Sequence, residues 1–349
     1  MTKVSVVVPV FNAAPYLRRC LDSLLAQTLG EIEIVCVDDG SADGSGEILD
    51  AFAARDGRLR VVHRSNAGAG AARNAGLDRT TGEYLFFCDA DDFAAPEMLE
   101  RLYVRAAAQD ADVVLTGRIF CSRHFGLRIP VRTSAVFGKA GRVFAGRDFP
   151  NDLFVAARTP LWDKLFRRSF VAERGIRFQT VPHSNDLFFV MAALAEAGRI
   201  VTDDGAYYTH CASHAGSLQN TKGKAPLALL EAYDGLERRF AERGLMSGFG
   251  IGLCRLLLRC GIREIVRFDD PEALSGFYDG FRARFVKAAS EAGMDAALGV
   301  TRWERRWARV IADEGSPEAF RRVSRSRRRR MRVLRMLKFV CGMRIEEVW

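Results

Sequence analysis

The stretch that decides the fold is Leu85-Phe86-Phe87-Cys88-Asp89-Ala90-Asp91-Asp92, an apolar run that ends abruptly in three carboxylates. This pattern predicts a buried strand that reaches the edge of its sheet, where Asp89 and Asp91 point to the same side if the chain stays extended. Two like charges at that spacing repel each other unless a cation lies between them, and an oxygen-only pair suits Mg²⁺ or Mn²⁺ better than zinc. The alternative is a solvated acidic turn that caps a helix beginning near Pro96.

Three more buried strands precede this one, and helices separate all four. A β-branched run predicts a strand at residues 4–10, and mostly apolar segments predict strands at 32–37 and 59–63. Apolar residues at helical spacing predict the helices between them. Such alternation is typical of a doubly wound, mostly parallel α/β sheet, whose ligand crevice lies beyond the carboxyl ends of its strands. Both acidic clusters, Asp38-Asp39 and residues 89–92, fall at such ends.

The second half of the chain is expected to begin with a helix at 96–108 and a strand at 112–116, followed by loops and short strands to residue 158. An apolar helix is predicted at 187–197, and residues from 226 onward are expected to be helical. We therefore predict a domain over residues 1–220, with halves at 1–120 and 121–220, and an α-helical C-terminal region over 221–349.

Length and composition indicate a globular protein with an ample core. The chain has 349 residues, of which 48% are hydrophobic, and its eight cysteines are scattered without the paired spacing of metal ligands. We expect these cysteines to be small core residues of a reduced, cytoplasmic protein. The apolar part of residues 1–11 is too short for a secretory signal, and no run approaches the roughly 20 apolar residues of a membrane-spanning helix.

The formal charge of +9 resides in the C-terminal tail. Residues 321–349 hold eleven Lys or Arg and two Glu, so residues 1–320 are close to neutral. Arginines at 325, 328, 332 and 335 share one helical face, which predicts a basic amphipathic helix on an anionic membrane surface, worth about 1 kcal/mol per basic residue. Nucleic acid is not an expected partner, because no aromatic platform or recognition motif accompanies the charge. The alternative is a solvated helix packed on the body of the protein.

Two further motifs accompany the acidic run. Asp39 can accept hydrogen bonds from a base or a ribose, although Gly40 and Ser41 also fit a tight turn that caps a helix. Residues 66–74 are rich in Gly, Ala and Asn and can bring backbone amides and the Arg73 guanidinium to phosphate. Their layout imitates a dinucleotide fingerprint, but Arg73 replaces the third glycine.

Together these motifs resemble those of family 2 glycosyltransferases of the GT-A fold. The resemblance covers residues 1 to about 120 and rests on five motifs in the same order: Pro9-Val10-Phe11-Asn12, Gln27-Thr28-Leu29, Val37-Asp38-Asp39-Gly40-Ser41-Ala42-Asp43, Asn66 through Asn74-Ala75-Gly76-Leu77, and Asp89-Ala90-Asp91-Asp92. A looser similarity to bacterial surface-polysaccharide members extends to about residue 220 through Trp162-Asp163-Lys164-Leu165-Phe166-Arg167-Arg168 and Asn185-Asp186.

The resemblance implies a metal-dependent hexosyltransferase that moves a sugar from a nucleotide-diphosphate donor, with a UDP-sugar favoured, to a hydroxyl with inversion. The acceptor would be a glycan or a lipid-linked sugar in bacterial polysaccharide or cell-envelope biosynthesis, at the inner face of the plasma membrane. The metal is Mg²⁺ or Mn²⁺, with Asp91 as its direct ligand and Asp89 shared with the ribose side, whereas Asp92 keeps the solvated-turn interpretation. The other implied donor-binding residues are Pro9, Phe11, Asn12, Asp39, Asn66, Gly68, Arg73 and Ala90.

The family pattern takes its general base from a Glu-Asp pair, and the matching pair here is Asn185-Asp186. The resemblance therefore implies that Asp186 removes the proton of the acceptor hydroxyl, which is a weak nucleophile until a carboxylate does so. Asn185 departs from the pattern. One alternative is that Asp186 merely caps the following helix together with Ser184, and another is that His183 acts as the base or a metal ligand rather than as a polar loop residue.

Trp162, Lys164 and Asn185 are the expected acceptor residues, although Trp162 can equally be a core tryptophan instead of stacking on a sugar face. Two other classes of function remain open. A non-catalytic nucleotide-sugar binding protein is compatible with the departure at Asn185. An NAD-dependent oxidoreductase is disfavoured by Arg73 in place of a glycine.

Overall fold

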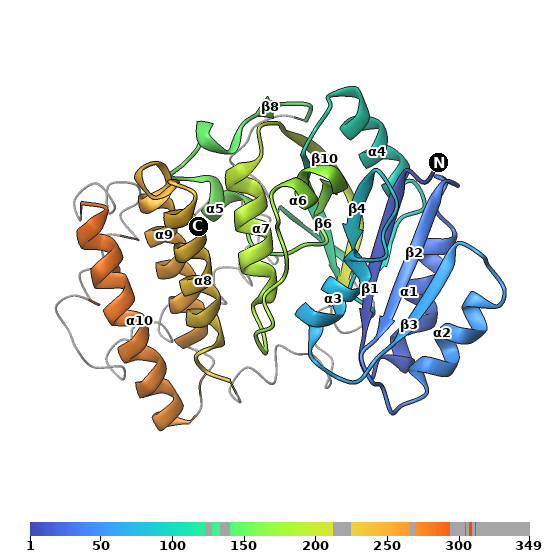
Figure 1. The fold of residues 1–349 in the computed structure, drawn as a ribbon, viewed down its shortest axis with the longest axis horizontal. Coiled ribbons are helices and arrows are strands. Elements are labelled where there is room, and N and C mark those ends of the chain that lie inside the picture. The colour runs from blue at the N-terminus through green and yellow to red at the C-terminus, as the bar shows by residue number, and fades with distance from the viewer. Residues whose placement is uncertain are drawn as a thin grey trace, which may run out of the picture. The chain divides into compact units, whose positions relative to one another are not determined.

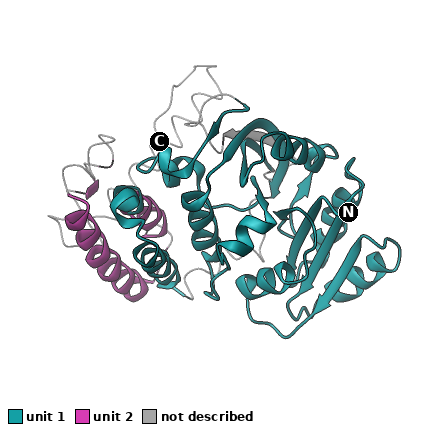
Figure 2. Ribbon diagram, turned by 45° about the horizontal axis from the view of Figure 1, so that its top comes forward, with its two compact units in different colours: residues 1–253 teal, residues 254–349 magenta. Residues whose placement is uncertain are grey.

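The computed structural model describes residues 1–122, 128–132, 140–211, 225–265, 268, 270–293, 304, 307, 308 and 311. The chain forms two compact units, residues 1–253 and 254–349 (Figure 2). The predicted domain boundary at residue 220 and the predicted membrane-binding helix at 321–349 both lie outside the described residues.

The first four strands form the parallel sheet that the sequence predicts (Figure 1). They are β1 (Val4–Val10), β2 (Ile32–Asp38), β3 (Leu59–His63) and β4 (Tyr84–Phe87), in the spatial order β3-β2-β1-β4. The helices between them are α1 (Ala14–Leu25), α2 (Ser45–Ala53) and α3 (Ala69–Leu77). All neighbouring pairs among these strands are parallel, so their carboxyl ends meet at one edge.

Alternate residues of these strands pack against helices on opposite faces of the sheet. Ile34 and Cys36 of β2 join the large core that includes buried residues of α1 and α2, whereas Val35 and Val37 pack with Ala72 of α3. Because successive side chains of a strand point to opposite faces, a run with no polar position must be covered on both sides. The first half of the chain is therefore doubly wound, as predicted.

Beyond β4 the sheet becomes mixed. β9 (Lys164–Arg167) is antiparallel to both β4 and β6 (Val113–Ser122), and β10 (Ile200–Cys211) is parallel to β6. The short strands β5 (Phe93–Ala94), β7 (Arg128–Arg132) and β8 (Val143–Phe144) are antiparallel to their neighbours. The predicted parallel pairing is thus complete among the first four strands. In the second half β6 and β10 are also parallel, but antiparallel strands, which need no crossover helix, interrupt the pattern.

Helices fill the remainder of the described chain. α4 (Met98–Ala108), α5 (Leu153–Ala157), α6 (Arg168–Glu173) and α7 (Asn185–Glu196) belong to the first unit, together with the short 3₁₀ helix Gly146–Asp148. The predicted helical C-terminal region is confirmed in α8 (Ala228–Glu242), α9 (Met246–Ile265) and α10 (Pro271–Glu291). Within the described residues, we find no helix with the length and apolar character needed to span a bilayer.

Candidate active site

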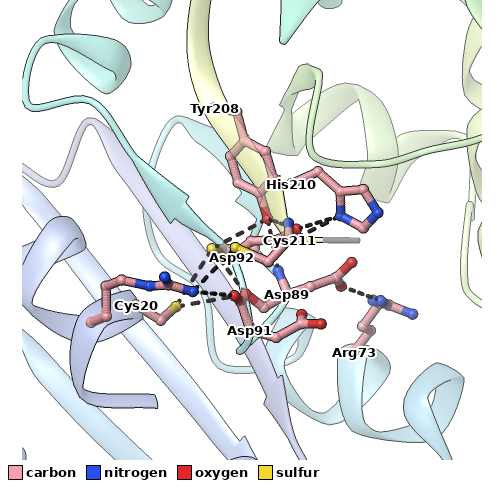
Figure 3. Close-up of polar contacts among 10 residues, drawn as sticks. Cys20, Arg73, Asp89, Asp91, Asp92, Tyr208, His210 and Cys211 are labelled. Carbon is pink, nitrogen blue, oxygen red and sulfur yellow. Dashed lines mark hydrogen bonds and ion pairs between the residues drawn. The ribbon is translucent and has the colours of Figure 1, made fainter. Parts of the chain in front are cut away.

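The three carboxylates of the acidic run differ in how they face solvent. Residues 89–92 follow β4 directly, at the carboxyl-end edge of the parallel strands. The side chain of Asp89 is 34% exposed and Asp91 is partly exposed, whereas Asp92 is fully buried. Asp89 and Asp91 therefore lie partly exposed at the edge, and Asp92 is buried in the protein (Figure 3).

The interpretation of Asp92 as part of a solvated turn is wrong. Its carboxylate accepts hydrogen bonds from the Tyr208 hydroxyl at 2.8 Å and the Cys211 backbone N–H at 2.7 Å, and it pairs with His210 Nδ1 at 3.1 Å (Figure 3). The Asp89 N–H in turn donates to the Tyr208 hydroxyl at 3.2 Å. Asp92 thus joins the acidic turn by hydrogen bonds to the end of β10, a strand that lies more than a hundred residues further along the chain.

The pKa values of Asp92 and His210 both lie above their ordinary values, for different reasons. Burial raises the pKa of Asp92 to about 6, against the opposing effect of His210. Burial alone would lower the pKa of His210, but its hydrogen bond with Asp92 and the nearby negative charges outweigh this and raise it to about 9. Near neutral pH the pair is therefore an imidazolium and a carboxylate.

His210→Phe should lower the free energy of unfolding at neutral pH by on the order of 3 kcal/mol, the low end of the usual cost of removing one partner of a buried ion pair. The variant leaves the fully buried carboxylate of Asp92 without the imidazolium that faces it. Urea unfolding at pH 7, without divalent metal, measures the loss. His63→Phe is the matched control, because His63 also pairs with two aspartates but is half exposed and screened by solvent; an equal loss in both variants would contradict the prediction.

Arg73 of α3 connects the acidic turn to the start of α7. One terminal nitrogen donates to Asp89 Oδ1 at 2.8 Å, and the other donates to Asn185 Oδ1 at 2.6 Å. Arg73 is only 8% exposed, and Asn185 is also buried, so Asn185 contacts Arg73 in this structure and its contact with an acceptor stays a prediction. Asp186 follows in the first turn of α7 and is partly exposed. The structure thus brings the candidate base to the same edge as Asp89.

The alternatives to Asp186 lose support from the contacts around it. Ser184 precedes α7, but its side chain makes no capping hydrogen bond to the helix within the described part of the chain. Its hydroxyl instead lies 2.9 Å from His183 Nδ1, and the His183 Nε2–H donates to the Ala225 carbonyl at 2.8 Å. Because His183 is buried with both ring nitrogens in hydrogen bonds, it does not present a nitrogen to a substrate or a metal in this structure.

The ends of β1 and β2 are tied to each other by the predicted nucleotide-binding residues. Pro9 lies in β1, and Phe11 just beyond it is 50% exposed, an unusual position for a large aromatic ring. Asn12 adopts a left-handed backbone with φ 50°, and its side-chain oxygen accepts the Ala42 N–H at 2.9 Å. The backbone N–H of Asn12 donates to the Ser41 hydroxyl at 3.0 Å.

Asp39 holds the glycine-rich loop in place. Its buried carboxylate accepts the N–H groups of Gly68 at 2.7 Å and Ala67 at 3.1 Å, and it pairs with Arg64 at 3.2 Å. Asn66, which begins this loop, is exposed, and Ala90 of the acidic turn is buried. Whether Asp39 also receives a nucleotide base stays a prediction.

Trp162 and Lys164 lie inside the protein. Trp162 is 9% exposed and stacks on Tyr208 and His210, with ring centroids 5.5 and 5.2 Å away. Lys164 is fully buried, where its ammonium group contacts Asp163 Oδ1 at 2.5 Å and donates to the Pro160 carbonyl at 2.6 Å. This burial favours the core alternative for Trp162 and a structural role for Lys164, and their contact with an acceptor remains only a prediction.

The oxygen donors at the edge fit a divalent cation that is shared with a substrate. Among the described residues, no group of three or more His, Cys, Asp or Glu side chains is placed to hold a metal by itself. Mg²⁺ is usually bound by one or two carboxylates together with substrate phosphates and water. The two partly exposed carboxylates of Asp89 and Asp91 match that donor set in number and chemistry.

These features define an α/β protein that gathers carboxylates and a guanidinium at the carboxyl ends of parallel strands, where such sheets bind nucleotides. Residues 5–171 match the family model described as Glycosyl transferase family 2. The chain therefore carries a glycosyltransferase family 2 domain, and its sheet and helices have the GT-A fold.

Individual relatives agree with this assignment. The chain is 35% identical over 210 residues to EpsJ of Bacillus subtilis strain 168, described as an uncharacterized glycosyltransferase, and this match covers 58% of the chain and 60% of EpsJ. The chain spans between 38% and 60% of the length of the first four curated relatives that it matches. Two solved structures share its fold at 20% identity. S. aureus TarS 1–349 in complex with UDP-GlcNAc has a TM-score of 0.71 over 94% of this chain and 92% of that one. The mannosyltransferase PcManGT from Pyrobaculum calidifontis, in complex with GDP-Man and Mn²⁺, has a TM-score of 0.50 over 89% and 84%.

Proposed function

We propose that this protein is a metal-dependent, inverting glycosyltransferase that moves a sugar from a nucleotide-diphosphate donor to a hydroxyl of a glycan or lipid-linked acceptor. One observation carries the proposal: the hydrogen bonds from Arg73 to Asp89 and to Asn185 bring the start of α7 to the acidic turn. This contact supports a single site for the donor-side carboxylates and the candidate base, although 112 residues separate Arg73 from Asn185.

On the donor side, Asp91 and Asp89 would hold Mg²⁺ or Mn²⁺, which when bound stabilises the negative charge that gathers on the leaving diphosphate. Arg73 adds a second positive charge beside Asp89, with one terminal nitrogen 2.8 Å from Asp89 Oδ1. The exposed ring of Phe11 offers an apolar surface to the nucleoside. We favour UDP as the nucleotide, which agrees with the UDP-GlcNAc complex of TarS.

On the acceptor side, Asp186 would accept the proton of the attacking hydroxyl. A base at the start of α7 and a cation at the acidic turn would face each other across the donor sugar, so the hydroxyl attacks from the side opposite the leaving diphosphate and inverts the configuration. A 32% identical relative described as a poly(ribitol-phosphate) beta-glucosyltransferase supports a role in bacterial polysaccharide or cell-envelope synthesis. The predicted basic tail supports a peripheral position on the inner membrane surface.

The proposal predicts that a nucleotide-diphosphate sugar stabilises the protein only when Mn²⁺ or Mg²⁺ is present. A thermal-shift panel of UDP-, GDP- and dTDP-sugars measures this, because a ligand at 100 times its dissociation constant stabilises the folded state by roughly 2.7 kcal/mol. Asp91→Ala should abolish the difference between donor affinity with Mn²⁺ and without it, as measured by calorimetry. Because Asp91 is partly exposed, we expect Asp91→Ala to fold like wild type, so a loss of the Mn²⁺ effect would report on the metal site.

Three outcomes would count against the proposal or separate it from its rivals. Equal Mn²⁺ dependence in wild type and Asp91→Ala would remove the metal site from the acidic turn. Donor binding without hydrolysis or transfer in a broad acceptor screen would favour a non-catalytic binding protein. Saturable binding of NADH, followed by its fluorescence, would favour an oxidoreductase.

A further inference from the structure

Residues 176–184, which we call the docking segment, lie along one face of α3 and end immediately before α7. Four residues of α3 and its C-terminal end face this segment: Gly70, Arg73, Asn74 and Asp78. Their spacing of three or four positions places them on the same side of a helix. Arg73 contacts Asn185, just after the docking segment, and Asp78 pairs with Arg177 within it.

The central contact is a pair of hydrogen bonds between the Asn74 side chain and the backbone of Phe178. Asn74 Nδ2 donates to the Phe178 carbonyl at 2.9 Å, and the Phe178 N–H donates to Asn74 Oδ1 at 2.9 Å. A side-chain amide carries both a donor and an acceptor, so it satisfies the two backbone groups as a neighbouring strand would. Asn74 therefore fixes the position of the docking segment and also its direction.

Two further contacts make this arrangement rigid. A Cβ atom added to Gly70 would lie 2.1 Å from the Gln179 carbonyl oxygen, so the docking segment approaches α3 more closely than any other residue at position 70 allows. The Phe178 ring stacks on Phe189 of α7 with centroids 4.2 Å apart, and meets Phe87 of β4 edge-on at 5.1 Å. The docking segment is thus packed simultaneously on α3, on α7 and on the strand that ends in the acidic turn.

From these contacts we propose that Asn74 is a positioning residue that sets the place of Asp186 relative to Asp89 and Asp91. Asn74 acts through the backbone of Phe178 and through α7. The inference rests on the proposed function, because Asp186 is the base of that reaction. A displacement of about 1 Å at a reacting group can lower the reaction rate about 10²-fold. A contact that fixes the position of α7 should therefore affect kcat more than the affinity for the donor.

The test compares Asn74→Ala with Gln27→Ala in the full chain. Gln27 is a matched control, since its buried amide also donates to a backbone carbonyl, that of Ala95, and accepts a backbone N–H, that of Leu99. We expect Asn74→Ala to lower kcat about 10- to 100-fold with donor affinity within about threefold of wild type. Gln27→Ala should keep kcat near wild type despite a similar loss of thermal stability.

Hydrogen exchange of the Phe178 amide provides a readout that needs no activity. Asn74→Ala should lose protection at this amide, because the acceptor of its N–H is removed. Gly70→Ala keeps Asn74 and raises helix propensity by about 1 kcal/mol, yet should also lower kcat because its methyl group pushes Gln179 away. Unchanged kcat in Asn74→Ala, or an equal loss in Gln27→Ala, would overturn the inference. A wild-type enzyme that transfers no sugar would instead refute the proposed function, while the exchange measurement would still report on the contact.

Discussion

Replacing Asp186 with Asn should lower kcat by about 10²- to 10⁴-fold, the range that a positioned general base contributes. Asparagine has nearly the same shape and still accepts hydrogen bonds, but it cannot take the proton of the acceptor hydroxyl. Donor affinity should be unchanged, because Asp186 lies in the first turn of α7, whereas the donor-side groups Asp89 and Asp91 follow β4. The loss therefore appears in kcat and not in the dissociation constant of the nucleotide sugar.

Single-turnover transfer and calorimetric donor binding, measured on the same preparation, test this separation. Asp110→Asn is a suitable control, since it makes the same chemical change at an exposed aspartate paired with Arg167, outside the candidate site. The pH dependence of kcat gives a second readout, because the ascending limb in wild type reports ionisation of the base and should be absent from the residual activity of Asp186→Asn. Transfer by this variant at a rate near wild type would show that another group takes the proton.

The sequence predicts the first four strands, and the edge at which the donor-side candidates lie, because the signals are local. Each of these strands is a short, mostly apolar segment, and candidate polar residues follow directly at a carboxyl end, as Asp39 and Asp89 do. In a parallel sheet these ends meet at one edge, so correct strand assignment is enough to bring the residues together. No knowledge of distant packing is needed.

The contacts that complete the site could not be predicted in this way. Asp92 is held by Tyr208 and His210, and nothing near Asp92 in the sequence indicates that β10 will cover it. Whether Asp92 is buried depends on which strand packs beside the acidic turn. That strand is β10, whose pairing with β6 contains register shifts that its sequence does not signal. The docking segment carries no periodic pattern either, since its position is set by single contacts such as that of Asn74.

The departure at Asn185 has a physical consequence at Arg73. The amide oxygen of Asn185 accepts a hydrogen bond from Arg73 but carries no charge, so Asp89 is the one charged partner of this guanidinium among the ion pairs of the described residues. A glutamate at 185 would share Arg73 between two carboxylates and reduce the positive charge available to a diphosphate. Asn185 therefore keeps the geometry that places α7 while leaving more of the Arg73 charge on the donor side.

The largest expected effect on folding comes from the buried pair of Lys164 and Asp163. Lys164→Met should lower the free energy of unfolding by about 3–5 kcal/mol at neutral pH, the usual cost of removing one partner of a buried ion pair. Both side chains lie in the interior, with Lys164 Nζ 2.5 Å from Asp163 Oδ1, so methionine fills the space of the lysine but leaves a carboxylate without its counter-charge. Urea unfolding measures the loss.

The double variant Asp163→Asn/Lys164→Met is the decisive comparison, because it removes both charges and should recover much of the loss. The deficit of Lys164→Met should also shrink as pH falls. Burial raises the pKa of Asp163, and a carboxyl whose folded pKa exceeds its unfolded value favours folding more when it is protonated. A single variant as stable as wild type, or a double variant less stable than the single one, would show that the pair contributes through packing alone. The negative charge of Asp186 is among those that act on Lys164, so the same lysine that stabilises the interior also lies within electrostatic range of the proposed base.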